Sequence, residues 1–180
     1  MSSIGSDFQQ DFFRLFDLPL CFQLDTALLE QHYRALQVQF HPDKFSHLPE
    51  AEQRLSMQWS TRINEGYQTL RKPLNRARYL LALRGVDTQE ETNTAMPLDF
   101  LMAQMEWRED IAAARQAKDD AALDGLADKL RQETRTLEQQ LGCLLDDEQD
   151  YLAAAGIVRK LKFFEKLAEE IASAFDELDH

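Results

Sequence analysis

The sequence predicts an all-α protein built from two helical domains. Its 180 residues include only six glycines and five prolines, with 44% hydrophobic and 29% charged residues, which is typical of a folded, helix-rich chain. Apolar residues recur at steps of three and four, the period of an amphipathic helix. One polar stretch lacks this period. We therefore expect domains over residues 1–84 and 98–180, joined by a linker over residues 85–97.

The first domain opens with an aromatic segment that ends at Pro19. The segment contains four phenylalanines, Phe8, Phe12, Phe13 and Phe16. A long helix follows, because Asp25 suits the position that caps its start and Pro42 requires it to stop. The apolar stripe of this helix consists of Leu29, Tyr33, Leu36 and Phe40.

Two further helices complete the first domain. The apolar stripe of the second long helix consists of Leu55, Trp59, Ile63, Tyr67 and Leu70. Because only a short polar segment, residues 43–49, separates the two long helices, we expect them to pack antiparallel. Pro73 suits the first turn of the next helix, and Gly85 marks its end.

The second domain is predicted to be a three-helix bundle. Its first helix, residues 98–117, places four apolar residues on one face, namely Phe100, Trp107, Ile111 and Ala114. The second helix carries Leu123, Leu126, Leu130, Thr134, Leu137, Leu141 and Leu144 at steps of three and four. Residues 146–150 interrupt the pattern. The last helix carries Ile157, Leu161, Phe164, Ala168, Ile171, Phe175 and Leu178.

The first helix of the bundle has a second apolar stripe opposite Phe100. This stripe consists of Leu98, Leu101, Met102 and Met105. Glu106 and Glu109 border it, and Phe163 of the last helix projects away from the seam of that helix. Methionines beside carboxylates are typical of a surface that docks a basic protein. The alternatives are packing against the first domain, or a helix that is hydrophobic on all sides.

Charge is spread unevenly along the chain, whose formal net charge is -12. Residues 1–84 carry ten Lys or Arg and nine Asp or Glu, whereas residues 85–180 carry ten and twenty-three. The excess of acidic residues argues against nucleic acid as a partner, because phosphates are neutralised by clustered basic residues. Two halves with different electrostatics indicate two different partners.

The cysteines and the absence of long apolar segments indicate the compartment. Cys21 and Cys143 are too few and too far apart for a metal clamp or a disulfide framework, so we expect buried, reduced thiols. We expect no secretory signal, because residues 1–6 lack a basic start and an apolar run. We expect no membrane partner, because no apolar stretch approaches the ~20 residues of a membrane span. A cytoplasmic location follows.

The tripeptide His41-Pro42-Asp43 lies where the two long helices of the first domain meet. Pro42 stiffens the turn, while His41 and Asp43 can make charge-assisted hydrogen bonds to a partner. Lys44 and Arg34 would add basic contacts. Two other interpretations stay open, namely a helix stop followed by an Asx-type cap, and a metal site that also includes His47.

In this setting the tripeptide resembles the J domain of DnaJ-type co-chaperones, and residues 7–75 carry the resemblance. The resemblance implies that this loop and the preceding helix bind an ATP-loaded DnaK-type chaperone and raise its rate of ATP hydrolysis. J domains usually line that helix with several basic residues, whereas Arg34 stands here among Gln31, His32, Gln37 and Gln39. This departure favours binding to one dedicated chaperone partner rather than to many chaperones.

The continuation of the chain resembles the HscB family of iron-sulfur assembly co-chaperones. The matching segments are His41-Pro42-Asp43-Lys44-Phe45, Pro73-Leu74, Arg76-Ala77, Tyr79-Leu80-Leu81, Phe100-Leu101-Met102, and Val158-Arg159-Lys160-Leu161 with Phe163. The resemblance implies an L-shaped molecule, in which a J domain, an antiparallel helical hairpin with short flanking helices, is joined to a C-terminal three-helix bundle. It also implies scaffold-binding positions at Leu101, Met102, Met105, Glu106, Glu109 and Phe163. One further position, acidic in the family, is Ala113 here.

Together these features predict a co-chaperone that is not an enzyme and needs no cofactor. It would deliver an IscU-like iron-sulfur cluster scaffold protein to an HscA-like chaperone of the DnaK type and stimulate the chaperone's ATPase. No Walker-type loop or nucleophile elbow occurs in the sequence. The alternatives are a J-domain co-chaperone for another client, and an acidic helical interaction protein without a chaperone role.

Overall fold

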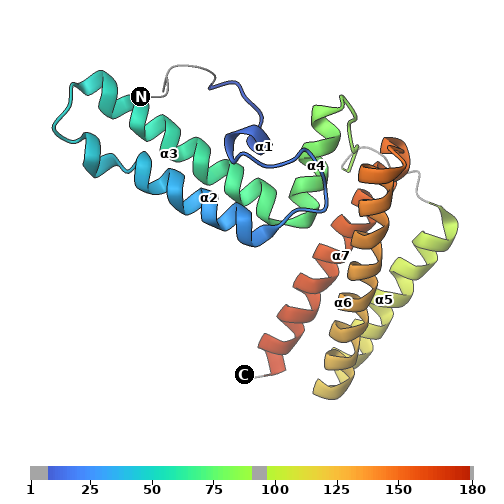
Figure 1. Ribbon diagram of the computed structural model, residues 1–180. Coiled ribbons are helices and arrows are strands. Elements are labelled where there is room, and N and C mark those ends of the chain that lie inside the picture. Colours follow the sequence, from blue (N-terminus) through green and yellow to red (C-terminus); the bar gives the residue numbers. More distant parts are fainter. Residues whose placement is uncertain (1–7, 91–96, 179–180) are drawn as a thin grey trace. The chain divides into compact units, whose positions relative to one another are not determined.

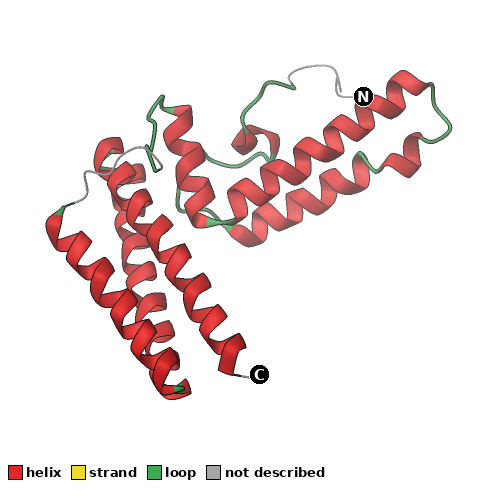
Figure 2. Ribbon diagram, turned by 180° about the vertical axis from the view of Figure 1, so that it is seen from behind, coloured by secondary structure: helices red, strands yellow, loops and turns green. Residues whose placement is uncertain are grey.

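The protein is all-α, as the sequence predicts. The computed structural model describes residues 8–90 and 97–178, and every regular element in these ranges is helical (Figures 1 and 2). The elements are α1 (Phe12–Leu15), α2 (Thr26–Gln39), η1 (Pro42–Phe45), α3 (Glu50–Arg71), α4 (Pro73–Leu83), α5 (Leu98–Ala117), α6 (Asp120–Gly142), η2 (Cys143–Asp147) and α7 (Tyr151–Leu178).

The chain divides into two compact units, Met1–Leu80 and Leu81–His180. The division falls within α4, shortly before the boundary that the sequence predicts at residue 84. The predicted linker lies partly outside the described residues, because positions 91–96 are among those not described.

The first unit is built around the antiparallel pair α2 and α3 (Figure 1). Asp25 caps α2 as expected, since its carboxylate accepts hydrogen bonds from the backbone N–H groups of Ala27 and Leu28. The rings of Tyr33 and Tyr67 stack across the pair with centroids 3.9 Å apart. Apolar burial and aromatic stacking therefore hold the two helices together.

The aromatic segment at the start of the first unit packs against α3. Phe12, Phe13 and Phe16 are buried, whereas Phe8 is 43% exposed and lies outside this group. The backbone N–H of Phe12 donates to the hydroxyl of Tyr79 at 3.0 Å, and burial raises the pKa of Tyr79. Phe12, Phe13 and Phe16 therefore fill this part of the core, and the more exposed Phe8 packs edge-to-face on Trp59.

The second unit contains the bundle of α5, α6 and α7 (Figure 2). The predicted core face of α5 is confirmed, because the buried residues of this helix are Phe100, Trp107, Ile111 and Ala114. The predicted seam of α7 is confirmed at Leu161, Phe164 and Ile171, which are buried. It is wrong at Ala168, which is exposed beside the fully buried Leu167. The buried face of α7 turns along its length, so no single straight stripe describes the helix.

Neither cysteine is deeply buried. Cys143 is exposed in η2, so the expectation of a buried thiol is wrong at that position, and Cys21 is half-buried. Neither cysteine forms a disulfide bond. Among the residues that the structure describes, none of the helices is both long and apolar enough to cross a membrane.

Gly66 on α3 allows α1 to approach closely. A Cβ at this position would lie 2.8 Å from Cδ1 of Phe12 and 3.0 Å from Cε2 of Phe16.

We expect Gly66→Ala to lower the free energy of unfolding, measured by urea denaturation, by about 1–3 kcal/mol, because the buried rings must shift. Gly125→Ala is the matched control, since open space surrounds that helical glycine. The control should raise stability by about 0.5–1 kcal/mol. Equal stabilisation by both changes would contradict the close packing.

Candidate functional site

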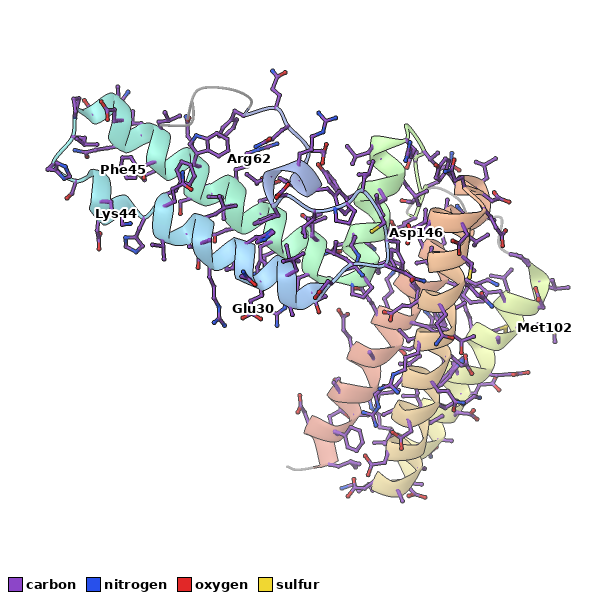
Figure 3. All side chains as sticks on the ribbon, viewed as in Figure 1. Glu30, Lys44, Phe45, Arg62, Met102 and Asp146 are labelled. Carbon is purple, nitrogen blue, oxygen red and sulfur yellow. The ribbon has the colours of Figure 1, made fainter. Side chains whose placement is uncertain are left out.

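The tripeptide His41-Pro42-Asp43 lies at the end of the α2–α3 pair. The helix α2 ends at Gln39, and Pro42 begins the 3₁₀ turn η1. The side chain of His41 is 57% exposed and that of Asp43 is 91% exposed. Lys44 is also exposed, and Figure 3 shows it in this turn. The turn therefore presents an imidazole, a carboxylate and an ammonium group to solvent.

The imidazole of His41 organises the turn. Its Nδ1 atom accepts a hydrogen bond from the backbone N–H of Asp43 at 3.3 Å, so His41 rather than Asp43 caps η1. The same Nδ1 lies 3.6 Å from the carboxylate of Asp43. To accept this hydrogen bond, Nδ1 of His41 must carry no proton. Nε2 then carries the ring proton and can donate it in a hydrogen bond to a partner.

No metal site accompanies the tripeptide in the described ranges. No group of three or more His, Cys, Asp or Glu side chains in residues 8–90 and 97–178 is arranged to hold a metal ion. His47 is exposed in the same loop. The metal-site interpretation of His41, Asp43 and His47 therefore gains no support.

Arg34 is exposed on α2, one helical turn after Glu30. Figure 3 labels Glu30 on this helix. The guanidinium of Arg34 is 2.5 Å from the carboxylate of Glu30, and the Arg34 side chain is 73% exposed. An exposed i,i+4 pair of this kind contributes little to stability. It does offset the positive charge of Arg34, so α2 presents a weaker positive field than Arg34 alone would give.

A second candidate surface is the outer side of α5, here called the α5 face. Its apolar side chains are Leu98, Leu101, Met102 and Met105, which are 73%, 38%, 55% and 64% exposed. Figure 3 shows Met102 projecting away from α6 and α7. Glu106 and Glu109 are exposed beside it, and Ala113 is exposed further along the helix. The structure thus brings five of the predicted scaffold-binding residues to one exposed face, namely Leu101, Met102, Met105, Glu106 and Glu109.

Phe163 does not share this exposure. It is only 7% exposed and packs edge-to-face on Phe100 with ring centroids 5.7 Å apart. The guanidinium of Arg108 lies 5.6 Å from the Phe163 ring centroid and covers the ring. The expectation of a projecting Phe163 is wrong because the buried face of α7 has turned, so that Phe163 lies one helical turn before the fully buried Leu167.

A groove of about 480 Å³ opens along the bundle beside α5. Its lining combines aromatic rings with polar residues of α6 and consists of Phe100, Ala103, Trp107, Lys129, Gln132, Glu133, Thr136, Leu137, Lys160, Phe163 and Phe164. The Lys129 ammonium lies 4.7 Å from the Trp107 ring centroid. Helical periodicity did not reveal this groove, because a groove depends on how neighbouring helices are spaced.

The second unit matches a known protein family. Residues 96–172 match the family model described as the HSCB C-terminal oligomerisation domain. Curated relatives named Co-chaperone protein HscB homolog match nearly the whole chain. The relative from Aromatoleum aromaticum is 53% identical over 173 residues, which cover 96% of this chain and 98% of that protein. The relative from Azoarcus sp. is 51% identical over 174 residues, which cover 97% and 98%.

Solved structures show the same similarity in three dimensions. Chaperone HscB from Vibrio cholerae superposes with a TM-score of 0.84 at 39% identity, covering 94% of this chain and 99% of that one. The human co-chaperone protein HscB superposes with a TM-score of 0.87 at 32% identity, covering 92% and 82%. Both the J-like first unit and the bundle are therefore shared with these proteins.

The different environments of Phe163 and Met105 predict different effects on stability. We expect Phe163→Ala to lower the free energy of unfolding by about 3 kcal/mol or more, because it leaves a cavity beside Phe100. Met105→Ala should change it by less than about 0.5 kcal/mol, because Met105 is 64% exposed. Thermal and urea unfolding measure both changes. A neutral Phe163→Ala would mean that this ring is exposed after all.

Proposed function

This chain belongs to the HscB family of co-chaperones, and from that premise we propose its specific role. It binds an IscU-like iron-sulfur cluster scaffold protein and delivers it to an HscA-like chaperone of the DnaK type. It also stimulates the ATPase of that chaperone, which assists transfer of the cluster to recipient proteins. The cluster is cargo of the scaffold, and ATP hydrolysis belongs to the chaperone.

The observation that carries the proposal is the presence of one exposed candidate surface in each unit. In the first unit, His41 and Asp43 hold their side chains in solvent at the end of a helical pair. In the second unit, Met102 and Met105 are more than half exposed on a helix whose other face fills the core. Two surfaces in separate units suit a protein that engages two partners.

The chaperone surface relies on directed hydrogen bonds. The carboxylate of Asp43 accepts and the Nε2–H of His41 donates, so the pair matches a partner that offers both a cationic donor and an acceptor. Lys44 supplies a positive charge, while the charge of Arg34 is offset by Glu30. This balance supports recognition by local geometry rather than by long-range attraction.

The scaffold surface combines apolar contact with an acidic border. Burying the exposed methionine and leucine side chains against a partner lowers the free energy of the complex, and the flexible methionine side chain adapts to the partner's shape. Glu106 and Glu109 favour a partner with basic residues at the edge of the contact. Because Phe163 is buried, we assign it the role of supporting α5 from beneath through Phe100.

The proposed setting is the bacterial cytoplasm. The HscB homologs from Aromatoleum aromaticum and Azoarcus sp. are bacterial proteins. Neither cysteine of this chain forms a disulfide bond, which suits a reducing compartment.

His41→Gln tests the chaperone surface. The change removes the imidazole that caps η1 and offers the Nε2 donor, so stimulation of the HscA-like ATPase should fall to the level without co-chaperone. A steady-state ATPase assay measures this loss. His47→Gln is the matched control, because His47 is an exposed histidine of the same loop, and it should retain stimulation. Full stimulation by His41→Gln would refute the assignment.

Leu101→Ala combined with Met105→Ala tests the scaffold surface. Removing two exposed apolar contacts should weaken binding to the IscU-like scaffold at least about tenfold by isothermal titration calorimetry. Chaperone stimulation without scaffold should stay unchanged. Leu152→Ala is the control, because Leu152 is an apolar residue of α7 that is 78% exposed. Equal scaffold affinity for the double variant and the control would exclude the α5 face.

A further inference from the structure

The exposed tripeptide requires support from elsewhere. Because the side chains of His41 and Asp43 lie mostly in solvent, burial of these side chains cannot hold the turn in one conformation. The turn must therefore be held through its backbone. Three carbonyl groups that flank the tripeptide, those of Phe40, Ser46 and Leu48, accept hydrogen bonds from side chains of α3.

Ser56 holds the backbone just before the tripeptide. Its hydroxyl donates to the carbonyl of Phe40 at 3.0 Å, and Ser56 is only 2% exposed. The carbonyls at the end of a helix lack partners within the helix, so this bond satisfies a group that α2 leaves free. The ring of Phe40 also stacks on Trp59 of α3, with centroids 5.4 Å apart. The start of the turn is thereby tied to α3.

Gln53 holds the backbone after the tripeptide. Its side-chain amide donates to the carbonyl of Ser46 at 3.2 Å and to the carbonyl of Leu48 at 2.8 Å. An amide group has two hydrogens to donate, and both are used here. Within the turn, the hydroxyl of Ser46 donates to the carbonyl of Asp43 at 2.8 Å. Through Ser46, the hydrogen bonds of Gln53 are thus connected to the backbone of the tripeptide at Asp43.

We propose that Gln53 and Ser56 form an α3 clamp, a pair of positioning residues that hold the His41-Pro42-Asp43 turn in the conformation that the chaperone binds. This inference rests on the proposed function. The two residues are three positions apart, so they project from adjacent turns of the same side of α3. They tie both ends of the turn to one rigid helix, which removes most of its freedom before the partner arrives.

The consequence for binding follows from populations. If the turn samples other conformations, the apparent affinity for the chaperone falls in proportion to the competent fraction. In the complex, the turn of the variant makes the same contacts with the chaperone as the wild-type turn. The maximal stimulation should therefore be unchanged. Loss of the α3 clamp should therefore raise the co-chaperone concentration that gives half-maximal stimulation, and leave the maximum unaltered. An unfolded fraction of the variant would also raise the half-maximal concentration, but it would lower the helical signal in circular dichroism, which loss of the α3 clamp should leave unchanged.

The test is Gln53→Met combined with Ser56→Ala in the full chain. We expect the half-maximal concentration to rise about fivefold, the factor that loss of one net hydrogen bond supports. Amide hydrogen exchange at Lys44 and Leu48 should become faster, because both amides donate within the turn. Ser60→Ala combined with Gln68→Met is the matched control on α3, and it should behave as the wild type.

The outcomes separate this inference from the proposed function. A wild type that gives no stimulation refutes the proposed function, and the α3 clamp with it. A wild type that stimulates, with a double variant that has the same half-maximal concentration, overturns the α3 clamp alone. A lower maximum at an unchanged half-maximal concentration also overturns it. Gln53→Met by itself, at a half-buried position, provides the same test if the double variant folds poorly.

Discussion

The antiparallel contact between α2 and α3 is the interaction on which the first surface depends. Stacking of Tyr33 on Tyr67 and of Phe40 on Trp59 fixes the register of the two helices along their length. Because a short segment joins α2 to α3, this segment must lie at the end of the helical pair, where it is exposed to solvent. The position of His41 in this connection is therefore a consequence of how two helices bury their apolar stripes.

The second surface depends on a limit of three-helix packing. A helix of the bundle can place one face in the core, and α5 uses Phe100 and Trp107 for this purpose. Ion pairs join α5 to α7, with 3.0 Å between Arg115 and Glu177. The apolar residues on the far side of α5 have no place in the core. Their exposure costs stability, which a bound partner would recover.

Each surface is built from residues of a single unit, so the contacts that support it lie within that unit. In the first unit, polar side chains of α3 hold the backbone of a turn that has little burial of its own. In the second unit, aromatic packing beneath α5 keeps the helix in place while its outer side stays open. Under the proposed role, a partner bound at one surface would leave the contacts that support the other surface in place.

The sequence by itself determined the helices and the exposed residues that follow from helical period. Asp25 and Pro42 mark ends of helices through local hydrogen bonding and sterics, and these signals need no tertiary context. Only the tertiary structure decided the burial of Phe163, since period alone does not say how a long helix turns relative to its neighbours. The hydrogen bonds of Gln53 and Ser56 to the turn likewise became visible only there. They join polar groups on separate elements, and such contacts leave no periodic trace in a sequence.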